Sequence, residues 1–363
     1  MLKKSGRIDE LQILRAIAFL EIFLGHCGVG FFTGAFGVSI FIVLSGFCMA
    51  VNYLPKADSI SLSPVTNVKS AAGKIKKLYG LHLIMLGFAF LLAKMPTSAE
   101  ALKRLVLDVL LLQSLSPHSA DFFSYNGVAW HLSTYLFICI LSLYVIKLVA
   151  KCKDKKCIYV LAVAIYGVMV AVGYLAIRRP VAMGDNFAFW FTYIFPGYRI
   201  LEFALGVILG CIYLKGKERE KTSKVWMTVA ELLAVCAFLA VIKVFHKMEG
   251  VYDGLCYTAL FTPVSIYLVY VFAKSRGWCM KVLNNPVTIW IGNISSYTFL
   301  IHQMAIRMLQ QKLPQTLEGN ARVVVIICLS FILSAIGAEV VKVVQKYIAE
   351  QEKTREFKLT IKS

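Results

Sequence analysis

Two ionisable residues of complementary chemistry lie in one apolar stretch near the N-terminus. Arg15 and His26 are eleven residues apart, so at 100° per residue they share one face of a helix, about 16 Å apart along its axis. An ionisable group inside an apolar span is costly unless it is paired or hydrated, which makes both residues functional candidates. A guanidinium suits a phosphate-bearing ligand, and an imidazole deeper in the span suits a general base. The alternative is that Arg15 extends to the nearer interface and His26 bonds a neighbouring carbonyl.

A second set of ionisable side chains interrupts apolar stretches further along the chain. Arg199 and Glu202 are three residues apart and therefore face the same side of a helix. They either neutralise each other as an ion pair or form part of a polar tunnel wall. His302 could bind a second substrate, act as a second base, or pack as a structural histidine.

The composition requires a membrane around these stretches. Hydrophobic residues make up 59% of the 363 residues, charged residues 16%, and the mean hydropathy is +0.71. A soluble domain is about half apolar and about a quarter charged. We therefore expect an all-α, polytopic membrane protein of about ten spanning helices. The expected spans are 11–31, 35–54, 76–94, 128–149, 157–177, 188–213, 225–245, 254–273, 286–308 and 321–345.

The distribution of basic residues tests this order of spans. Of the 39 Lys and Arg residues, we assign 27 to the side of the N-terminus, nine to the opposite side and three to spans. This bias predicts that both termini are cytoplasmic, and it requires the short apolar stretch 104–115 to be an interfacial or re-entrant helix. The net charge of +19 then signals orientation and attracts anionic lipids rather than nucleic acid. We expect one transmembrane domain, 1–345, and a short charged cytoplasmic tail, 346–363, that frays or forms coil.

Five motifs surround the candidate residues along nearly the whole chain. They are Arg15…His26, Gly37-Val38…Phe41…Ser45-Gly46-Phe47, Trp130-His131-Leu132-Ser133, Arg199-Ile200-Leu201-Glu202-Phe203…Gly206 and Ser295-Ser296-Tyr297-Thr298-Phe299-Leu300-Ile301-His302. In this order they resemble the acyltransferase 3 family of integral membrane acyltransferases, which modify bacterial surface polysaccharides and related acceptors. Each motif alone is weak, and the five in order are specific.

The resemblance implies transfer of an acyl group, in the simplest case acetyl, from cytoplasmic acyl-CoA to a hydroxyl of a cell-envelope carbohydrate or related acceptor. It implies a bacterial plasma membrane as the location and His26 as the general base, with Arg15 also in the catalytic set. We expect no metal and no permanently bound cofactor. The remaining candidates for substrate binding are Ser45, Lys74, Lys77, Trp130, Ser133, Arg199, Glu202, Tyr297 and His302.

Two positions depart from the family pattern. Lys74-Ile75-Lys76-Lys77 stands where the family often has Arg-x-x-Arg, so the charge remains but the bidentate fork is lost. Tyr135 replaces an acidic residue that is frequent in relatives, and the role of that acid therefore cannot be transferred.

The alternative function is a transporter or flippase of a polar or lipid-linked solute, which would also use buried charges. Transporters often contain inverted repeats, and we find none by inspection. No phosphate-binding glycine loop supports nucleotide hydrolysis. The acceptor, the acyl chain length, an acyl-enzyme intermediate, the role of His302 and the oligomeric state stay open.

Overall fold

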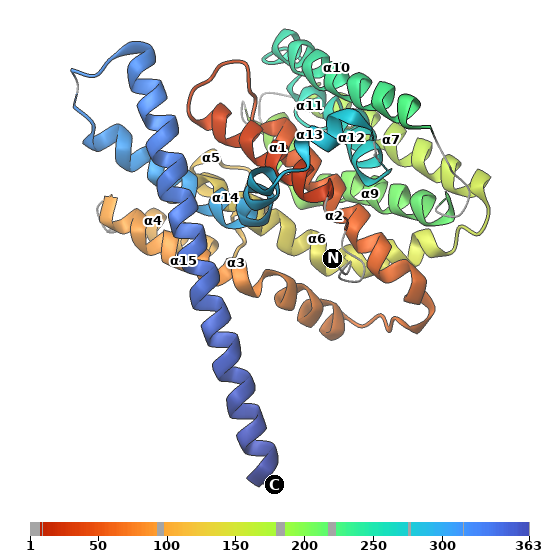
Figure 1. Ribbon diagram of the computed structural model, residues 1–363, viewed down its shortest axis with the longest axis horizontal. Helices are drawn as coiled ribbons and strands as arrows, with labels where there is room; N and C mark the ends of the chain where they lie inside the picture. Colours follow the sequence, from red (N-terminus) through yellow and green to blue (C-terminus); the bar gives the residue numbers. More distant parts are fainter. Residues whose placement is uncertain are drawn as a thin grey trace.

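The computed structural model describes residues 8, 10–92, 98–178, 186–216, 223–274, 277–314 and 316–362, and within them it contains helices and no strands (Figure 1). The N-terminal segment 1–7, most of the loop between the expected spans 188–213 and 225–245, and residues 95–97 just after the expected span 76–94 lie outside these ranges. The longer helices are α1 (Glu10–His26), α2 (Ala35–Tyr53), α3 (Pro64–Leu92), α4 (Ala99–Val109), α6 (Trp130–Ala150), α7 (Lys155–Ile177), α9 (Pro196–Gly216), α10 (Lys224–Met248), α12 (Phe261–Lys274), α14 (Pro286–Lys312) and α15 (Gly319–Lys362). Shorter helical segments are η1 (Leu54–Ser59), η2 (Gln113–Leu115), α5 (Ser119–Phe122), η3 (Gly127–Ala129), α8 (Phe187–Phe189), η5 (Trp190–Ile194), α11 (Asp253–Cys256) and α13 (Trp278–Leu283).

Eight helical segments of the described chain are long and apolar enough to cross a membrane, and they contain α2, α3, α6, α7, α9, α10, α12 and α15. The protein is therefore an all-α, multi-pass membrane protein, as the composition predicts. The other two expected spans form α1 and α14, which fall short of the same test because α1 has only 17 residues and polar residues interrupt α14. These two helices carry the candidate functional residues Arg15, His26 and His302.

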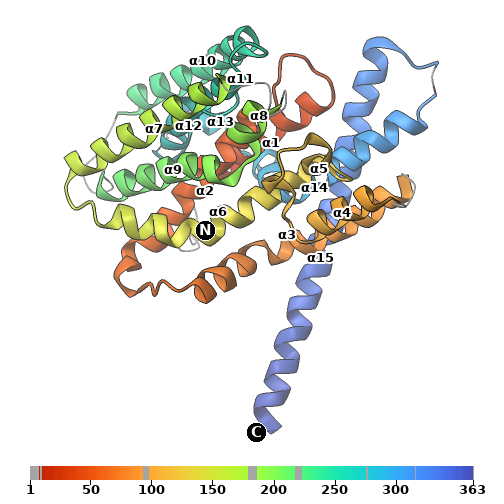
Figure 2. The ribbon, with the colours of Figure 1, turned by 180° about the vertical axis from the view of Figure 1, so that it is seen from behind.

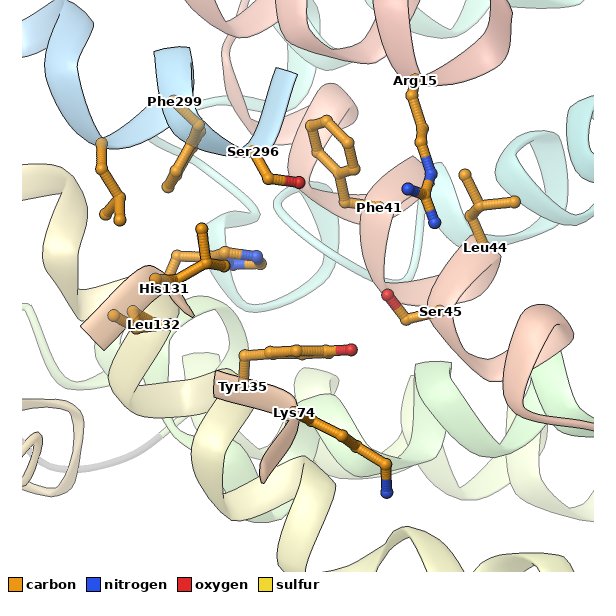
Figure 3. Close-up of a pocket in the computed structure, with 12 residues that line it drawn as sticks. Arg15, Phe41, Leu44, Ser45, Lys74, His131, Leu132, Tyr135, Ser296 and Phe299 are labelled. Carbon is orange, nitrogen blue, oxygen red and sulfur yellow. The ribbon is translucent and has the colours of Figure 1, made fainter. Parts of the chain in front are cut away.

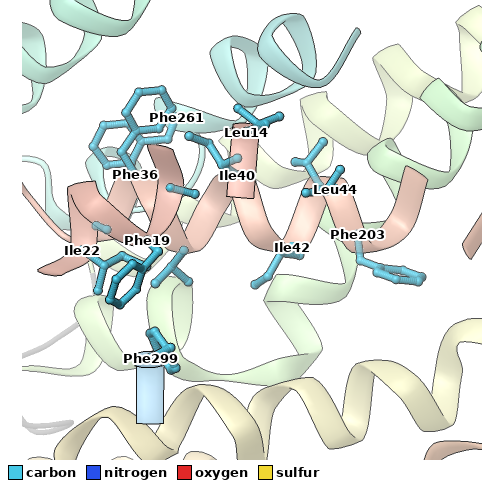
Figure 4. Close-up of a cluster of buried hydrophobic side chains, with 14 of the residues drawn as sticks. Leu14, Phe19, Ile22, Phe36, Ile40, Ile42, Leu44, Phe203, Phe261 and Phe299 are labelled. Carbon is cyan, nitrogen blue, oxygen red and sulfur yellow. The ribbon is translucent and has the colours of Figure 1, made fainter. Parts of the chain in front are cut away.

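Glycines set the closest helix packing at the centre of the bundle. A Cβ added at Gly46 of α2 would collide with the carbonyl oxygen of Phe203 in α9, and one at Gly206 would collide with that of Val43. Small residues of this kind let helix backbones approach closely in lipid. α1 packs against both α2 and α14 at the same centre. Apolar side chains from all of these helices fill the space between them (Figure 4).

The segment between α3 and α6 contains a short helix near the expected 104–115, with shifted bounds. α4 begins after Ser98, whose Oγ accepts the Ala101 N–H at 3.2 Å, and at 11 residues it is too short to span. The chain then reverses through Leu111, which has a positive φ of 54°. Ser133 Oγ donates to the Leu111 carbonyl at 2.6 Å, which ties this segment to the first turn of α6.

The end of the chain differs from the expected frayed tail. α15 runs without a break for 44 residues to Lys362, and both views show its C-terminal half projecting away from the other helices (Figures 1 and 2). The reason is local, because the segment after residue 345 lacks Gly and Pro and supports helix through pairs such as Lys346 with Glu350, four residues apart. Residue 345 therefore marks a change of composition and no change of secondary structure.

Candidate active site

Two histidines from helices far apart in sequence form a direct hydrogen bond. His26, the last residue of α1, has its Nδ1 2.8 Å from Nε2 of His302 in α14. The two rings are stacked with centroids 5.1 Å apart. His302 is fully buried, whereas His26 keeps an exposed edge. The structure thus brings together two residues that the sequence proposes separately.

The hydrogen bonds of His302 decide which nitrogen carries each proton. Its Nδ1 lies 2.7 Å from the carbonyl oxygen of Phe299, and because a carbonyl only accepts, this nitrogen must donate. In the neutral ring Nε2 is then an acceptor, so His26 donates to it through Nδ1. The remaining nitrogen of His26, Nε2, is left with a free lone pair, which is the arrangement that a general base requires.

Glu21 holds the loop that follows His26. Its carboxylate accepts the backbone N–H groups of Thr33, Gly34 and Gly37, at 2.7–3.0 Å, together with the Thr33 hydroxyl at 2.9 Å. These bonds join the middle of α1 to the start of α2. Gly34 adopts a φ of 71°, and a Cβ there would lie 4.0 Å from Nε2 of His26. Glu21 therefore positions the backbone that borders the free imidazole nitrogen.

A cavity of about 240 Å³ carries two cations in its wall (Figure 3). Arg15 of α1 and Lys74 of α3 both line it, as does Ser45 of α2. These are three of the residues proposed from the sequence. The Lys74 ammonium also donates to Ser70 Oγ at 3.1 Å, which keeps it near the start of α3.

Phe299 lies between this cavity and the histidine pair. Its ring lines the cavity, and its centroid is 5.3 Å from that of His131 and 5.8 Å from that of His302. Arg15 and His26 thus share α1, as their spacing predicts, but only Arg15 lines the cavity.

Sequence reasoning missed two residues of the cavity wall. His131 and Tyr135 are four residues apart on α6, and both line the cavity. Nδ1 of His131 is buried and has no hydrogen-bond partner in the described part of the chain. The signal was present in the sequence, because an i, i+4 pair places both side chains on one face of a helix. Ser296 of α14 also lines the cavity from the opposite wall.

Other proposed residues support the helices and do not line the cavity. Arg199 and Glu202 form an ion pair of 3.0 Å with no exposed side-chain surface. Glu202 accepts the hydroxyl of Ser39 in α2, and Arg199 donates to Thr258 at 2.5 Å. This network joins α9 to its neighbours and corresponds to the ion-pair reading of the sequence.

The last four proposed residues also face away from the cavity. Trp130 packs against Tyr193 with the rings tilted and their centroids 4.8 Å apart, and Ser133 holds the Leu111 segment described above. Tyr297 donates to Gln345 of α15 at 2.9 Å. Lys77 lies on the side of α3 that faces α15, so the structure separates it from Lys74.

Comparisons with known proteins identify the architecture. The profile of one family, described as Acyltransferase domain and belonging to the acyltransferase 3 group, matches residues 8–339. No solved structure is significantly similar to the chain.

Three relatives illustrate the range of similar proteins. A Staphylococcus aureus (strain COL) protein with a provisional O-acetyltransferase name is 24% identical over 321 residues, which cover 83% of this chain and 51% of that protein. The acyltransferase MdmB of Streptomyces mycarofaciens is 26% identical, covering 83% of this chain and 79% of its own length. The exopolysaccharide production protein ExoZ of Rhizobium meliloti (strain 1021) is 26% identical, with 77% and 78% covered. The chain spans about half the length of the Staphylococcus relatives it matches. Because the family profile covers most of the chain, this protein belongs to the acyltransferase 3 family of membrane acyltransferases.

Proposed function

We propose that the protein transfers an acyl group, in the simplest case acetyl, from acyl-CoA to a hydroxyl of a cell-envelope carbohydrate, with His26 as the general base. The observation that carries this proposal is the His26–His302 hydrogen bond of 2.8 Å, because it leaves Nε2 of His26 free to accept a proton. Family membership supports acyl transfer over the transporter alternative.

The cavity beside Arg15 and Lys74 is the proposed donor site. Two cations in one wall suit the phosphates of CoA, and Lys74 acts as a point charge rather than a bidentate clamp. A volume of about 240 Å³ is below that of a typical site for a whole small molecule. The cavity would therefore hold one part of acyl-CoA while the rest extends past Lys74.

In the proposed reaction, one proton moves from the acceptor hydroxyl to His26 and then from His26 to the leaving sulfur. The acceptor hydroxyl gives its proton to Nε2 of His26 while its oxygen attacks the thioester carbonyl. The C–S bond then breaks, and the CoA sulfur leaves as a thiol after taking the proton from His26. General-base catalysis of this kind contributes about 10²–10⁴-fold in rate. Phe299 lies where donor and acceptor must meet, so its ring has to move or lie along the bound thioester.

The acceptor class follows from chemistry and from the relatives. A neutral imidazole suits a hydroxyl nucleophile, and one relative bears the name of an exopolysaccharide production protein. A carbohydrate hydroxyl approaching the exposed edge of His26 fits both observations. The residues themselves do not specify which sugar accepts the group.

Thiol release tests the proposal. Purified protein is incubated with acetyl-CoA and a panel of envelope saccharides, and free CoA thiol is measured together with the mass of each saccharide. We expect thiol release that depends on a saccharide, with a matching gain of one acetyl group. Saccharide counterflow in proteoliposomes without any thiol release would instead support the transporter.

A further inference from the structure

A long apolar groove lies on the opposite side of α14 from the cavity. α3 and α15 both pack on α14 and make little contact with each other, which leaves a groove of about 740 Å³ between them. Ile301, Met304 and Met308 of α14 form its floor. Figure 1 shows α15 diverging from the bundle beside α3.

The walls of the groove expose large apolar side chains from two helices. Ile84 and Phe88 of α3 are 53% and 49% exposed, and Val340 and Val344 of α15 are 55% and 49% exposed. In α3 these residues repeat at four-residue spacing, so they form one stripe along the helix. Hydrocarbon from the bilayer must cover such a surface, because water would be excluded at this depth.

One end of the groove is basic and polar. Lys76 and Lys77 lie there together with Gln345 and Glu352. Gln345 donates to the Lys77 carbonyl at 2.9 Å, and the Lys76 ammonium is 3.7 Å from Glu352. The Lys77 ammonium pairs with no carboxylate within the described ranges. The end therefore keeps a net positive charge, on the side that the basic-residue bias assigns to the cytoplasm.

We propose that this groove binds one anionic phospholipid of the inner leaflet, with its phosphate at Lys76 and Lys77 and its acyl chain along the stripe of α3. The charge at the end of the groove selects the headgroup, and the apolar walls take the chain. The groove extends from Lys77 to Leu92, about 23 Å along the helix, which exceeds the depth of one leaflet, roughly 15 Å. The whole length of an acyl chain from the inner leaflet can therefore lie within the groove.

The proposed lipid divides the basic start of α3 between two ligands. Lys74 faces the donor cavity, and Lys76 and Lys77 face the lipid. The lipid would also contact α14 along Ile301, Met304 and Met308. This proposal stands independently of the acyl-transfer proposal, since neither the groove nor its basic end includes a residue of the cavity.

Lipid retention in native mass spectrometry tests the headgroup. Detergent-solubilised protein is titrated with phosphatidylglycerol and, separately, with phosphatidylcholine of the same chains. We expect wild type to bind one phosphatidylglycerol in preference to phosphatidylcholine. The Lys76→Gln/Lys77→Gln variant should weaken phosphatidylglycerol binding about 30-fold, which corresponds to about fivefold for each lysine near a membrane surface. Lys69→Gln, on the exposed start of the same helix, is the matched charge control and should bind like wild type.

A pair of glycine variants tests the groove itself. A Cβ at Gly80 or at Gly87 meets no atom within 4 Å, so leucine at either position is compatible with the fold. Gly80 lines the groove and Gly87 does not. Gly80→Leu should lower phosphatidylglycerol occupancy while Gly87→Leu leaves it unchanged.

Two results would overturn the proposal. Equal binding of phosphatidylglycerol and phosphatidylcholine by wild type would mean that the groove takes hydrocarbon without selecting a headgroup. Unchanged binding in both the lysine and the Gly80 variants would place any bound lipid elsewhere. Thermal stabilisation by acyl-CoA is measured on the same samples, and it should persist in the Lys76→Gln/Lys77→Gln variant. A loss of lipid binding can therefore be distinguished from a loss of donor binding.

Discussion

The hydrogen bond from His26 to His302 gives each imidazole a different task. His302 is fixed by the Phe299 carbonyl and accepts from His26, whereas His26 keeps a free Nε2. In the proposed mechanism His302 is therefore a positioning residue, which sets the tautomer of His26 without touching the substrate. The same logic of one ring nitrogen orienting the other recurs in acid–base sites.

Replacing His302 separates orientation from packing. His302→Leu removes the acceptor for His26 Nδ1 and should lower kcat at least about tenfold, a part of the general-base contribution. His302→Gln offers a side-chain oxygen as the acceptor and should recover part of that loss. KM for acyl-CoA should stay unchanged in both, because His302 does not line the donor cavity. Equal kcat values for the two variants would argue for a packing role only.

The cavity cations should act on donor binding. Arg15→Ala and Lys74→Ala each remove a charge from the cavity wall, so each should raise KM for acyl-CoA several-fold with a smaller effect on kcat. Lys69→Ala is the matched control on α3 and should match wild type. Steady-state kinetics with acyl-CoA as the varied substrate measure this, and an unchanged KM in both cavity variants would remove the cavity as the donor site.

At the scale of helices, the segment between α3 and α6 contains a pH-sensitive contact outside the spans. Asp108 of α4 is buried and accepts Gln113 Nε2 at 2.9 Å and the Ser124 hydroxyl at 2.5 Å. Burial raises the pKa of Asp108 to about 7, although the hydrogen bond from Ser124 opposes the shift. The folded segment therefore favours the protonated acid more strongly than the unfolded chain does.

The sign of the pH effect follows from this raised pKa. The contribution of protonated Asp108 to the free energy of unfolding is complete below the ordinary pKa of the acid. It is lost as pH rises towards 7, because the folded state holds a proton that the unfolded chain releases. Thermal unfolding midpoints should thus fall between about pH 4 and pH 7. Asp108→Asn copies the neutral acid, and this part of the pH dependence should disappear. A wild-type slope that persists in Asp108→Asn would assign it to another group.

How far the sequence specifies the helices can be judged from particular residues. Apolar length predicts most spans, and the eleven-residue spacing places Arg15 and His26 on one helix correctly. The partner of His26 is 276 residues away, and no local pattern indicates that α1 and α14 are neighbours. Lys74 and Lys77 look alike in sequence, yet they are divided between two surfaces because α15 packs along one side only. Local residue spacing predicts where the helices form. Tertiary packing determines which helices are neighbours and which surface each side chain lines.

At the scale of the whole molecule, the polar residues concentrate where helices meet. α1 and α14, the two helices that are least suited to contact lipid, pack against each other at the centre. The most apolar helices, such as α7 and α10, are mostly exposed along their lengths and face outward. The bundle thus keeps its ionisable residues inside an apolar shell, which is the arrangement that membrane burial of such groups requires.

Orientation in the membrane is the prediction at this scale. The bias of basic residues predicts that the 95–127 segment is outside and the loop between α6 and α7 is cytoplasmic. In a background without the exposed Cys157, Cys236 and Cys328, Pro117→Cys should react with an impermeant maleimide on intact cells. Lys156→Cys should react only after permeabilisation. The reverse pattern would invert the topology and place the basic end of the groove in the outer leaflet.

The most direct test of the account is the acyl-transfer rate of His26 variants whose donor binding is intact. We predict that His26→Ala lowers saccharide-dependent thiol release at least about a hundredfold while acyl-CoA still raises the thermal midpoint as it does in wild type. His26→Gln serves as a second variant in case the alanine variant does not fold, and it should be equally slow because an amide does not accept the proton. Thiol release within a few-fold of wild type in a folded variant that binds acyl-CoA would contradict the assignment of His26 as the base.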